Sequence, residues 1–254
     1  MVRISIYNEK GGVGKTTITA MLASYLAYAK GKSVCVLDFD YPSYHFLELR
    51  RSELTILKDP RSPLSIYMRI SSSPREPYDI FSIPPGPGGI YRAKEVFDYL
   101  PSILSVGYDY VFYDFPGRFT QDEAVSFIAA NGYLDFVAIP MDTDKQSRRS
   151  ALVVADTIHK EGIPLVLFWN RVSLWEAKGN GVRFERGAAP FRERGFEVMG
   201  EMVRDLRKFS RESSEMAFIR STFCFPERYV NQWSPAIIPF LDALQGRIDQ
   251  SQKD

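Results

Sequence analysis

The chain has 254 residues, 45% hydrophobic and 25% charged, which suits one large α/β domain with a buried core. Its net charge of +1 excludes strong attraction of the whole molecule to nucleic acid or anionic membranes, so such binding needs a local patch. The two cysteines lie far apart, and Cys35 falls in an apolar strand pattern that predicts a reduced core residue. No apolar run approaches the about 18 residues that span a bilayer, and the first residues lack a signal-peptide region. We expect a single cytoplasmic domain over residues 1–254.

A glycine-rich stretch, residues 8–17, dominates the amino-terminal part. It follows an alternating apolar run at residues 4–7 and precedes helical spacing at residues 18–27, which is the context of a phosphate-binding loop. Glycines let successive backbone N–H groups turn around an anion. Lys15 is predicted to reach the β- and γ-phosphates of a nucleotide, and the Thr16 hydroxyl to ligate Mg²⁺. The predicted nucleotide contacts in this loop are Gly11, Gly12, Val13, Gly14, Lys15, Thr16 and Thr17.

The loop departs from the common G-x-x-x-x-G-K-[ST] pattern. Glu9 stands where the first glycine is expected, and a second lysine, Lys10, follows it. The sequence motif K-G-G-x-G-K-[ST]-T is the deviant Walker A loop and resembles that of the ParA/MinD family of P-loop ATPases. Relatives of that family include the nitrogenase iron protein and the arsenical pump ATPase. The resemblance implies ATP and Mg²⁺ as cofactors and a SIMIBI-type P-loop fold.

Lys10 carries the most specific implication of this resemblance. In the deviant family the extra lysine crosses a dimer interface and contacts the nucleotide of the partner. The resemblance therefore implies an ATP-bound homodimer that hydrolysis loosens, with Lys10 and Lys15 both serving catalysis.

Two carboxylates stand at the end of the largely apolar run at residues 33–40. Asp38 and Asp40 end this predicted buried strand, and the carboxyl ends of parallel strands line the ligand crevice. The resemblance implies that Asp40 positions or activates the attacking water and that Asp38 helps to order the loop or the Mg²⁺ shell. The family's P-Q-G-N is replaced by residues 41–45, which leaves the details of hydrolysis open. For His45, at the end of this segment, a structural role is favoured over a functional one.

A second apolar strand, residues 108–114, ends in Asp114. This is the Walker B arrangement, in which the carboxylate holds Mg²⁺ through water. Pro116 and Gly117 match the family's D-x-P-[PG] pattern, and Gly117 has no Cβ to keep it from a γ-phosphate.

Two later segments are predicted to meet the nucleobase. Asn170 ends the apolar run 163–171 and resembles the adenine-recognising Asn of the family, because an amide pairs with both a donor and an acceptor on adenine. A turn-forming Asn remains the alternative. Arg171 beside it is included among the nucleotide contacts. Residues 222–226 stand where the family carries a loop that packs on the base, with Pro226 as a candidate.

The remaining pattern alternates strands and helices. Helices are expected at 43–59, 90–106, 121–130, 143–161 and 234–250, and further strands at 78–83, 134–140 and 196–203. Residues 60–77 are interpreted as a connection with a short amphipathic piece at 64–70. Residues 171–195 are polar, Gly-rich and Arg-rich and receive no element. This order predicts an α/β fold, a mostly parallel sheet of about seven strands with helices on both faces.

The leading functional hypothesis is an ATP-dependent switch of the ParA type that binds DNA non-specifically as a dimer and is stimulated by a ParB-like partner. It would act in the partition or maintenance of a plasmid, chromosome or conjugative element and associate with the nucleoid. Residues 8–45 resemble small Soj-like ParA proteins of Bacteroidetes mobile elements. The chain has no helix-turn-helix extension before its first strand, so sequence-specific operator binding is not expected. The basic candidates for DNA contact are Arg183, Arg186, Arg192, Arg194, Arg204, Arg207, Lys208 and Arg211, which as a charge run also fit a solvated surface.

Three alternatives were weighed against this hypothesis. A MinD-like membrane-cycling ATPase is disfavoured because residues 245–254 are too polar for a basic amphipathic helix, so no membrane partner is expected. A metal-cluster partner like the nitrogenase iron protein is set aside because neither Cys35 nor Cys224 follows the Walker B strand. A nucleotide-dependent scaffold with little turnover stays open because of the altered segment after Asp40.

Overall fold

The computed structural model describes residues 1–71, 76–86, 100–117, 128, 131–173, 181–205, 221–233 and 235–253. The strands are β1 (Val2–Ile6), β2 (Val34–Asp38), β3 (Asp79–Ser82), β4 (Tyr110–Asp114), β5 (Phe136–Met141) and β6 (Leu165–Trp169). The helices are α1 (Lys15–Ser24), continued by a π-helical turn η1 (Tyr25–Ala29), then α2 (His45–Ile56), α3 (Pro63–Ile70), α6 (Lys145–Lys160), α8 (Val182–Arg192), α9 (Glu227–Trp233) and α10 (Ile237–Gln250). No helix in these ranges is long and apolar enough to cross a bilayer.

The six strands form one sheet in the order β3-β2-β4-β1-β5-β6, and every pairing is parallel. This confirms the α/β fold with a parallel sheet. The order places β4 between β1 and β2, so the loop after β1 and the last residues of β2 and β4 share one edge of the sheet. Asp38 and Asp114 are direct neighbours in the β2–β4 register.

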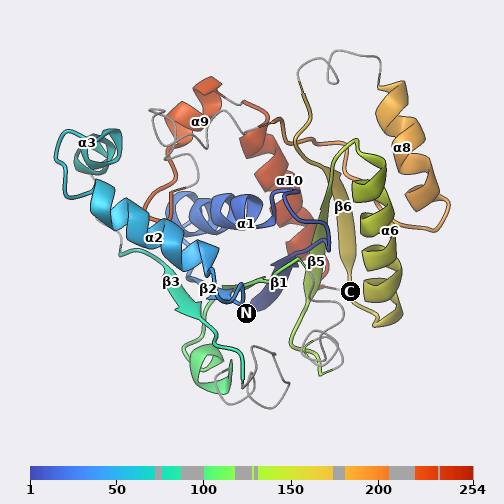
Figure 1. Ribbon diagram of the computed structural model, residues 1–254, viewed down its shortest axis with the longest axis horizontal. Coiled ribbons are helices and arrows are strands. Elements are labelled where there is room, and N and C mark those ends of the chain that lie inside the picture. Colours follow the sequence, from blue (N-terminus) through green and yellow to red (C-terminus); the bar gives the residue numbers. More distant parts are fainter. Residues whose placement is uncertain are drawn as a thin grey trace.

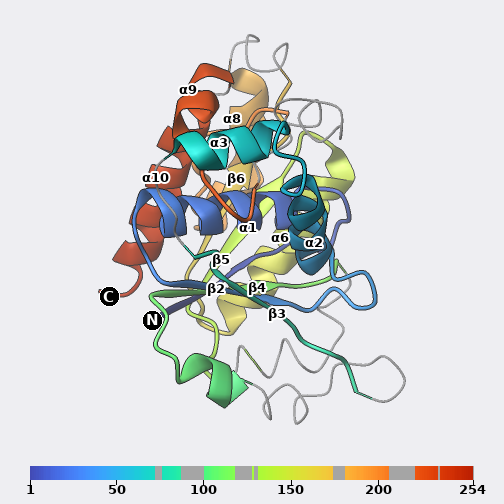
Figure 2. The same ribbon diagram turned by 90° about the vertical axis from the view of Figure 1, so that its left-hand side faces the viewer.

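Helices cover both faces of the sheet, as the continuous apolar runs of its central strands require. One core contains Cys35, Val111 and Val137 together with buried residues of α6 and α8. The other contains Val36 and Phe112 together with buried residues of α1 and α10. Figure 1 shows α6 and α8 on one side of the strands and α1 and α10 on the other. In Figure 2, α1 and α2 lie across the sheet from the helical turn at residues 100–104.

The expected strand at 196–203 is wrong, because this segment does not form a regular strand. Within the described residues the sheet has six strands, and this segment makes isolated parallel bridges at Val198 and Arg204. Met199 N donates to Leu167 O and Val203 N to Trp169 O. Met199 and Val203 are four residues apart, whereas their partners Leu167 and Trp169 on β6 are two apart. The segment therefore contains two extra residues, which bulge out and interrupt the ladder of hydrogen bonds.

Several helix expectations also differ from the structure. The Arg-rich stretch 171–195 contains α8, whose Phe184, Ala188 and Phe191 are buried at helical spacing despite Pro190 inside the helix. Helix α9 was not expected. Most of the expected helices 121–130 and 90–106 lies outside the described residues. Cys35 is fully buried, as predicted.

A buried carboxylate joins α2 to the segment before α9. Glu53 is 5% exposed and accepts hydrogen bonds from the backbone N and the hydroxyl of Thr222. Arg50 donates to the hydroxyl of Thr222 at 2.7 Å and to the carbonyl of Tyr78 at 2.9 Å. These bonds attach residues 221–226 to α2.

We predict that Glu53→Ala lowers the free energy of unfolding by about 2–4 kcal/mol, because two buried donors lose their acceptor. Urea denaturation measures the change. Glu48→Ala on the same helix is the control, since Glu48 is exposed and its i,i+3 pair with Arg51 contributes about 0.5 kcal/mol or less. Equal destabilisation by the two substitutions would contradict this role of Glu53.

Candidate nucleotide-binding site

The loop between β1 and α1 has the conformation of an anion cradle. Gly12 and Gly14 adopt φ values of +75° and +93°, which favour glycine. Gly14 is the N-cap of α1 and offers no side-chain cap, so the N–H groups of the first turn remain for a ligand. Gly12 and Gly14 therefore have the backbone conformation that such a loop needs, and nucleotide contact by Gly11, Gly12 and Gly14 stays a prediction.

Asn8 fixes the loop from the β5 side. Its side-chain N donates to the carbonyl of Pro140 at 2.8 Å. Its side-chain O accepts from the backbone N of Lys10 at 3.0 Å and from the Ser150 hydroxyl at 2.6 Å. Asn8 is fully buried, and sequence reasoning gave it no role. Its position as the first polar residue after an apolar strand was the available signal.

Asn170 and Arg171 fix the loop from the β6 side. The Asn170 Nδ2 donates to the carbonyl of Val13 at 2.6 Å, and its Oδ1 accepts from the backbone N of Arg171 at 2.9 Å. The Arg171 guanidinium donates to the carbonyl of Gly12. Both residues thus contact the backbone of the glycine-rich loop. The predicted contact of Arg171 with the nucleotide is not tested by these bonds and stays a prediction. Adenine recognition by Asn170 stays a prediction.

A buried charge cluster lies beneath the loop. Lys15 is 9% exposed; burial lowers the pKa of its ammonium group, while Asp114 and Asp40 act in the opposite direction. The Thr16 hydroxyl donates to Asp114 Oδ2 at 2.9 Å. Burial and the nearby Asp38 raise the pKa of Asp114 to about 7, against the smaller opposing effect of the Thr16 hydrogen bond.

The donor set of this cluster fits Mg²⁺. Asp114 Oδ1 is buried and has no hydrogen-bond partner among the described residues, and the Thr16 hydroxyl lies beside the other oxygen of the same carboxylate. Mg²⁺ prefers oxygen ligands and keeps several waters or phosphate oxygens. Within the described ranges no three Asp, Glu, His or Cys side chains gather as a complete metal site, so these other oxygens would supply the rest of the shell.

Asp38 binds backbone rather than side chains. Its oxygens accept from the backbone N of Phe46 at 2.9 Å, Leu47 at 3.1 Å and Asp40 at 3.1 Å. Burial is the main cause that raises the pKa of Asp38, and these three hydrogen bonds oppose it. Asp38 therefore holds the amino end of α2 against β2. Its predicted contact with the Mg²⁺ shell is left as a prediction.

Asp40 pairs with a residue that sequence reasoning had set aside. His45, the first residue of α2, places Nδ1 against Asp40 Oδ2. Asp40 is partly exposed, so its carboxylate can reach water as well as His45. The spacing of five residues across the turn before α2 was the signal for this pair.

Gly117, three residues after Asp114, approaches the loop closely. A Cβ placed at this position would lie 2.9 Å from the carbonyl of Glu9 and 3.2 Å from Lys15 Nζ. The absence of a side chain at Gly117 therefore serves contact with the phosphate loop, in the region where the sequence placed it.

Lys10 lies at the rim of the site and faces its own chain. Its ammonium group pairs with Asp144, the N-cap residue of α6, and this hydrogen bond lowers the pKa of the Asp144 carboxylate. In the single chain, Lys10 therefore pairs with a residue of its own chain, whereas the resemblance assigns it to the nucleotide of a partner.

The structure does not bring Pro226 to the loop. Its segment contacts the far end of α1, where Ser24 donates to the carbonyl of Ser221 and Phe225 packs on Tyr25. Ten residues of helix separate Tyr25 from Lys15, about 15 Å along the axis. The predicted base contact of Pro226 gains no support from these contacts.

The DNA candidates are scattered. Arg183 and Arg186 are exposed on α8, and Arg204 is exposed after the bulge. Arg192 and Arg194 form ion pairs with Glu185 and Asp156. The candidates Arg207, Lys208 and Arg211 lie outside the described residues.

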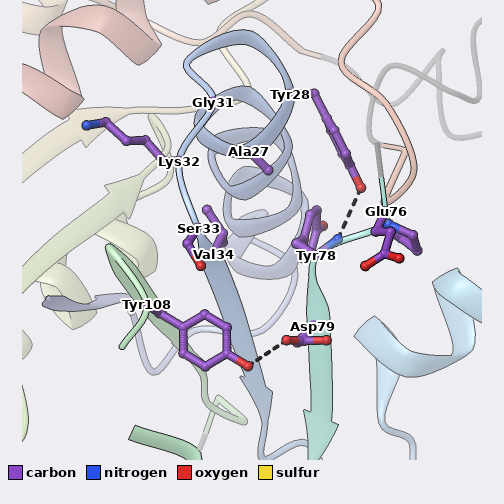
Figure 3. A pocket seen from close by; sticks show the side chains of 11 residues that line it. Ala27, Tyr28, Gly31, Lys32, Ser33, Val34, Glu76, Tyr78, Asp79 and Tyr108 are labelled. Carbon is purple, nitrogen blue, oxygen red and sulfur yellow. Dashed lines mark hydrogen bonds between the residues drawn. The ribbon is translucent and has the colours of Figure 1, made fainter. Parts of the chain in front are cut away.

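A cavity of about 440 Å³ lies at the opposite edge of the sheet, near the amino ends of β2 and β3. Figure 3 shows Tyr108 donating to Asp79 at 2.5 Å and the backbone N of Tyr78 donating to the Tyr28 hydroxyl at 3.4 Å. No residue of the glycine-rich loop lines this cavity, so it is separate from the nucleotide site.

Comparison with known proteins agrees with this geometry. The family model of the CobQ/CobB/MinD/ParA nucleotide-binding domain matches residues 4–232. The chain therefore belongs to this family of nucleotide-binding proteins.

Solved structures show the same fold. The MinD of a MinC:MinD cell division protein complex from Aquifex aeolicus has 21% identity and a TM-score of 0.65, covering 97% of this chain and 96% of that one. The pNOB8 ParA has 15% identity and a TM-score of 0.58, covering 99% and 98%. A putative plasmid partition protein from Borrelia burgdorferi B31 bound to AMPPNP has 20% identity and a TM-score of 0.57, covering 95% and 99%. No curated protein matches the sequence. Both MinD and partition proteins are among these neighbours, so the specific role is not resolved by them.

We predict that Gly14→Ala abolishes nucleotide binding and lowers the free energy of unfolding by about 2–4 kcal/mol. The added Cβ would lie 2.4 Å from Asn170 Nδ2 at a φ of +93°. Gly11→Ala is the matched control, because its Cβ meets no atom within 4 Å and its change in stability should stay within about 1 kcal/mol. Denaturation without nucleotide measures both variants, and similar stabilities would contradict the packing of Asn170 on Gly14.

We predict that Asp114→Asn stabilises the metal-free, nucleotide-free protein at pH 8 by on the order of 2–4 kcal/mol. The pKa of Asp114 is about 7 in the folded protein and near 3.8 ordinarily, so the folded state binds an extra proton between these values. Stability is therefore lost as the pH rises through this interval. Asparagine keeps an acceptor for Thr16 and carries no charge.

Denaturation in EDTA from pH 4 to pH 8 checks this expectation. The two proteins should be similar near pH 4 and diverge as the pH rises. Asp59→Asn, at an exposed carboxylate, should show no such divergence. A variant that is no more stable than the wild type at pH 8 would contradict the assignment.

Proposed function

We propose that this protein is an ATP-dependent dimerising ATPase of the ParA type that acts in the partition or maintenance of DNA. The observation that carries the proposal is the group formed by Lys15, Thr16 and the buried Asp114 under a glycine-rich loop. Such a group binds a nucleoside triphosphate together with Mg²⁺. When it is bound, Mg²⁺ polarises the phosphate oxygens. The neighbour bound to AMPPNP supports ATP as the nucleotide.

Hydrolysis is assigned to Asp40. Its carboxylate follows β2 at the edge where Asp114 ends β4, and it acts electrostatically on Lys15. Asp40 orients or deprotonates the attacking water, and His45 holds the carboxylate in place. An exposed His–Asp pair in a short turn positions water loosely, so slow turnover that a partner protein stimulates fits this geometry.

Dimerisation is assigned to Lys10. Its pair with Asp144 is partly exposed, and exposed ion pairs are weak and screened by salt. ATP in a second chain offers Lys10 a triphosphate instead of a carboxylate. Lys10 would exchange its partner Asp144 for the nucleotide of the second chain, which makes dimerisation depend on ATP. Hydrolysis of ATP would reverse this exchange.

The role in DNA maintenance rests on the neighbours named as plasmid partition proteins and on the exposed arginines of α8. Non-specific DNA and a ParB-like stimulating protein are the proposed partners. A plasmid, chromosome or conjugative element is the proposed cargo, as the resemblance implies.

A MinD-like positioning ATPase is the second candidate, because the MinD structure has the highest TM-score of the three neighbours described above. Helix α10 does not favour membrane cycling. Its apolar residues Phe240, Leu241 and Leu244 are buried in the core, and Asp249 accepts from Tyr110 at 2.6 Å. An apolar face that packs against its own sheet is not available to lipid.

We predict that Lys10→Ala abolishes the ATP-dependent dimer, because the partner's phosphates lose their cross-interface cation. Size-exclusion chromatography with ATP and Mg²⁺ measures this. Lys58→Ala, which removes an exposed lysine beyond α2, should dimerise as the wild type does.

Asp40→Ala separates dimerisation from turnover. It should form the dimer and hydrolyse ATP at least tenfold more slowly, as expected for loss of a positioned base. A wild type that stays monomeric with ATP would overturn the switch, and dimerisation with no turnover in the wild type would favour the scaffold.

A further inference from the structure

A small cavity lies between α6 and α8, on the flank of the nucleotide site. Its volume is about 60 Å³, and Thr143, Arg148, Trp169 and Arg183 line it. Gly187 allows α8 to approach, since a Cβ there would lie 2.8 Å from the Trp169 ring and 3.5 Å from the Arg148 guanidinium. The cavity has several times the about 10–15 Å³ that one water needs. That space accommodates a tetrahedral oxyanion.

Arg148 is the unusual member of this lining. Its Nε is buried and has no hydrogen-bond partner in the part of the chain that the structure describes. A buried donor without a partner is destabilising, more so when it belongs to a charged group. Guanidinium groups bind carboxylate and phosphate through two parallel hydrogen bonds, which would satisfy this donor.

The rest of the lining suits the same ligand. Arg183 brings a second guanidinium to the cavity from α8, and Thr143 brings a hydroxyl. Trp169 adds an aromatic ring to the lining.

We propose that this cavity, the α6–α8 site, binds a phosphate group of a nucleic-acid backbone. The inference rests on the DNA binding proposed above and assigns to it a residue, Arg148, outside the predicted set. Arg148 and Arg183 hold the phosphate oxygens, and Thr143 donates a further hydrogen bond.

The charges around the site favour a polyanion over a lone carboxylate. Lys145, Arg149 and Arg186 are exposed on the first turns of the same two helices. One nearby acid, Glu185, is already engaged in an ion pair with Arg192. A row of cations around an oxyanion cavity matches the repeated charge of a phosphodiester chain.

DNA binding by the ATP-loaded protein as a function of salt tests the site. Arg148→Gln and Arg183→Gln should each weaken binding about tenfold and reduce the slope of log affinity against log salt by about 0.9, the value for one phosphate contact. The double variant should lose less than the product of the two, because both arginines hold one phosphate.

Arg61→Gln is the charge-matched control. Arg61 lies between α2 and α3, on the opposite side of the molecule from α6 and α8 (Figure 1), and its side chain is 91% exposed. This variant should bind DNA within about twofold of the wild type. Arg148→Lys keeps the charge without the bidentate geometry and should recover only part of the affinity. ATP-dependent dimerisation and thermal melting should be unchanged in Arg183→Gln.

The outcomes separate the site from the function. If the wild type binds DNA and the Arg148 and Arg183 variants match Arg61→Gln, the α6–α8 site is wrong and the DNA function stands. If the wild type binds no DNA in any nucleotide state, both are wrong. Binding of polyglutamate instead of DNA, with the same dependence on Arg148, would assign the cavity to a protein carboxylate and overturn the phosphodiester.

Discussion

The burial of Asp114 beside Asp38 is the constraint on which the site depends. The two carboxylates are register neighbours at the carboxyl ends of β4 and β2. Asp38 is satisfied by three backbone N–H groups. Asp114 has the Thr16 hydroxyl and nearby Lys15, and its other oxygen has no hydrogen-bond partner among the described residues. The proposed Mg²⁺ would relieve this arrangement by binding the Asp114 carboxylate. A protein without a use for that cation would gain stability from a neutral residue at position 114.

The strand order is what assembles this cluster from distant parts of the chain. Because β4 lies between β1 and β2, the Walker B carboxylate ends next to both the phosphate loop and Asp38. Asn8 then ties the start of the loop to β5 and α6, and Asn170 binds the loop at the carbonyl of Val13. The loop is therefore ordered before any nucleotide arrives, which lowers the conformational entropy that binding must remove.

The fold and the centre of the site were predictable because local pattern encodes them. Apolar runs that end in Asp38 or Asp114 predict strands and place their carboxylates at one edge, and the glycine-rich loop predicts its own conformation. Asn8 and Arg148 were not assigned roles, because their surroundings come from segments that are distant in the chain. The pair of His45 with Asp40 is local, and its five-residue spacing was the one signal for it. Helix α8 was missed because Gly187, Pro190 and many arginines mask its apolar face, and Gly187 is there to admit Trp169 and Arg148.

Residue roles inferred from family resemblance were less secure where one side chain has several possible partners. Asn170 reaches the loop backbone, and Lys10 reaches Asp144. Asp144 both caps α6 and holds Lys10, so the start of that helix is coupled to the state of the lysine. A change in the pairing of Lys10 at the proposed dimer interface would thus alter the N-cap of α6, the helix that also carries Arg148.

The two-residue bulge opposite β6 has a consequence for the solution behaviour of the molecule. An uninterrupted outer strand would present a row of free N–H and C=O groups, and a second chain can extend such a row into a fibril. The segment that includes Met199 and Val203 pairs with β6 at two separated points and turns away between them, so this margin offers no continuous template. An imperfection in hydrogen bonding thereby acts as protection against aggregation.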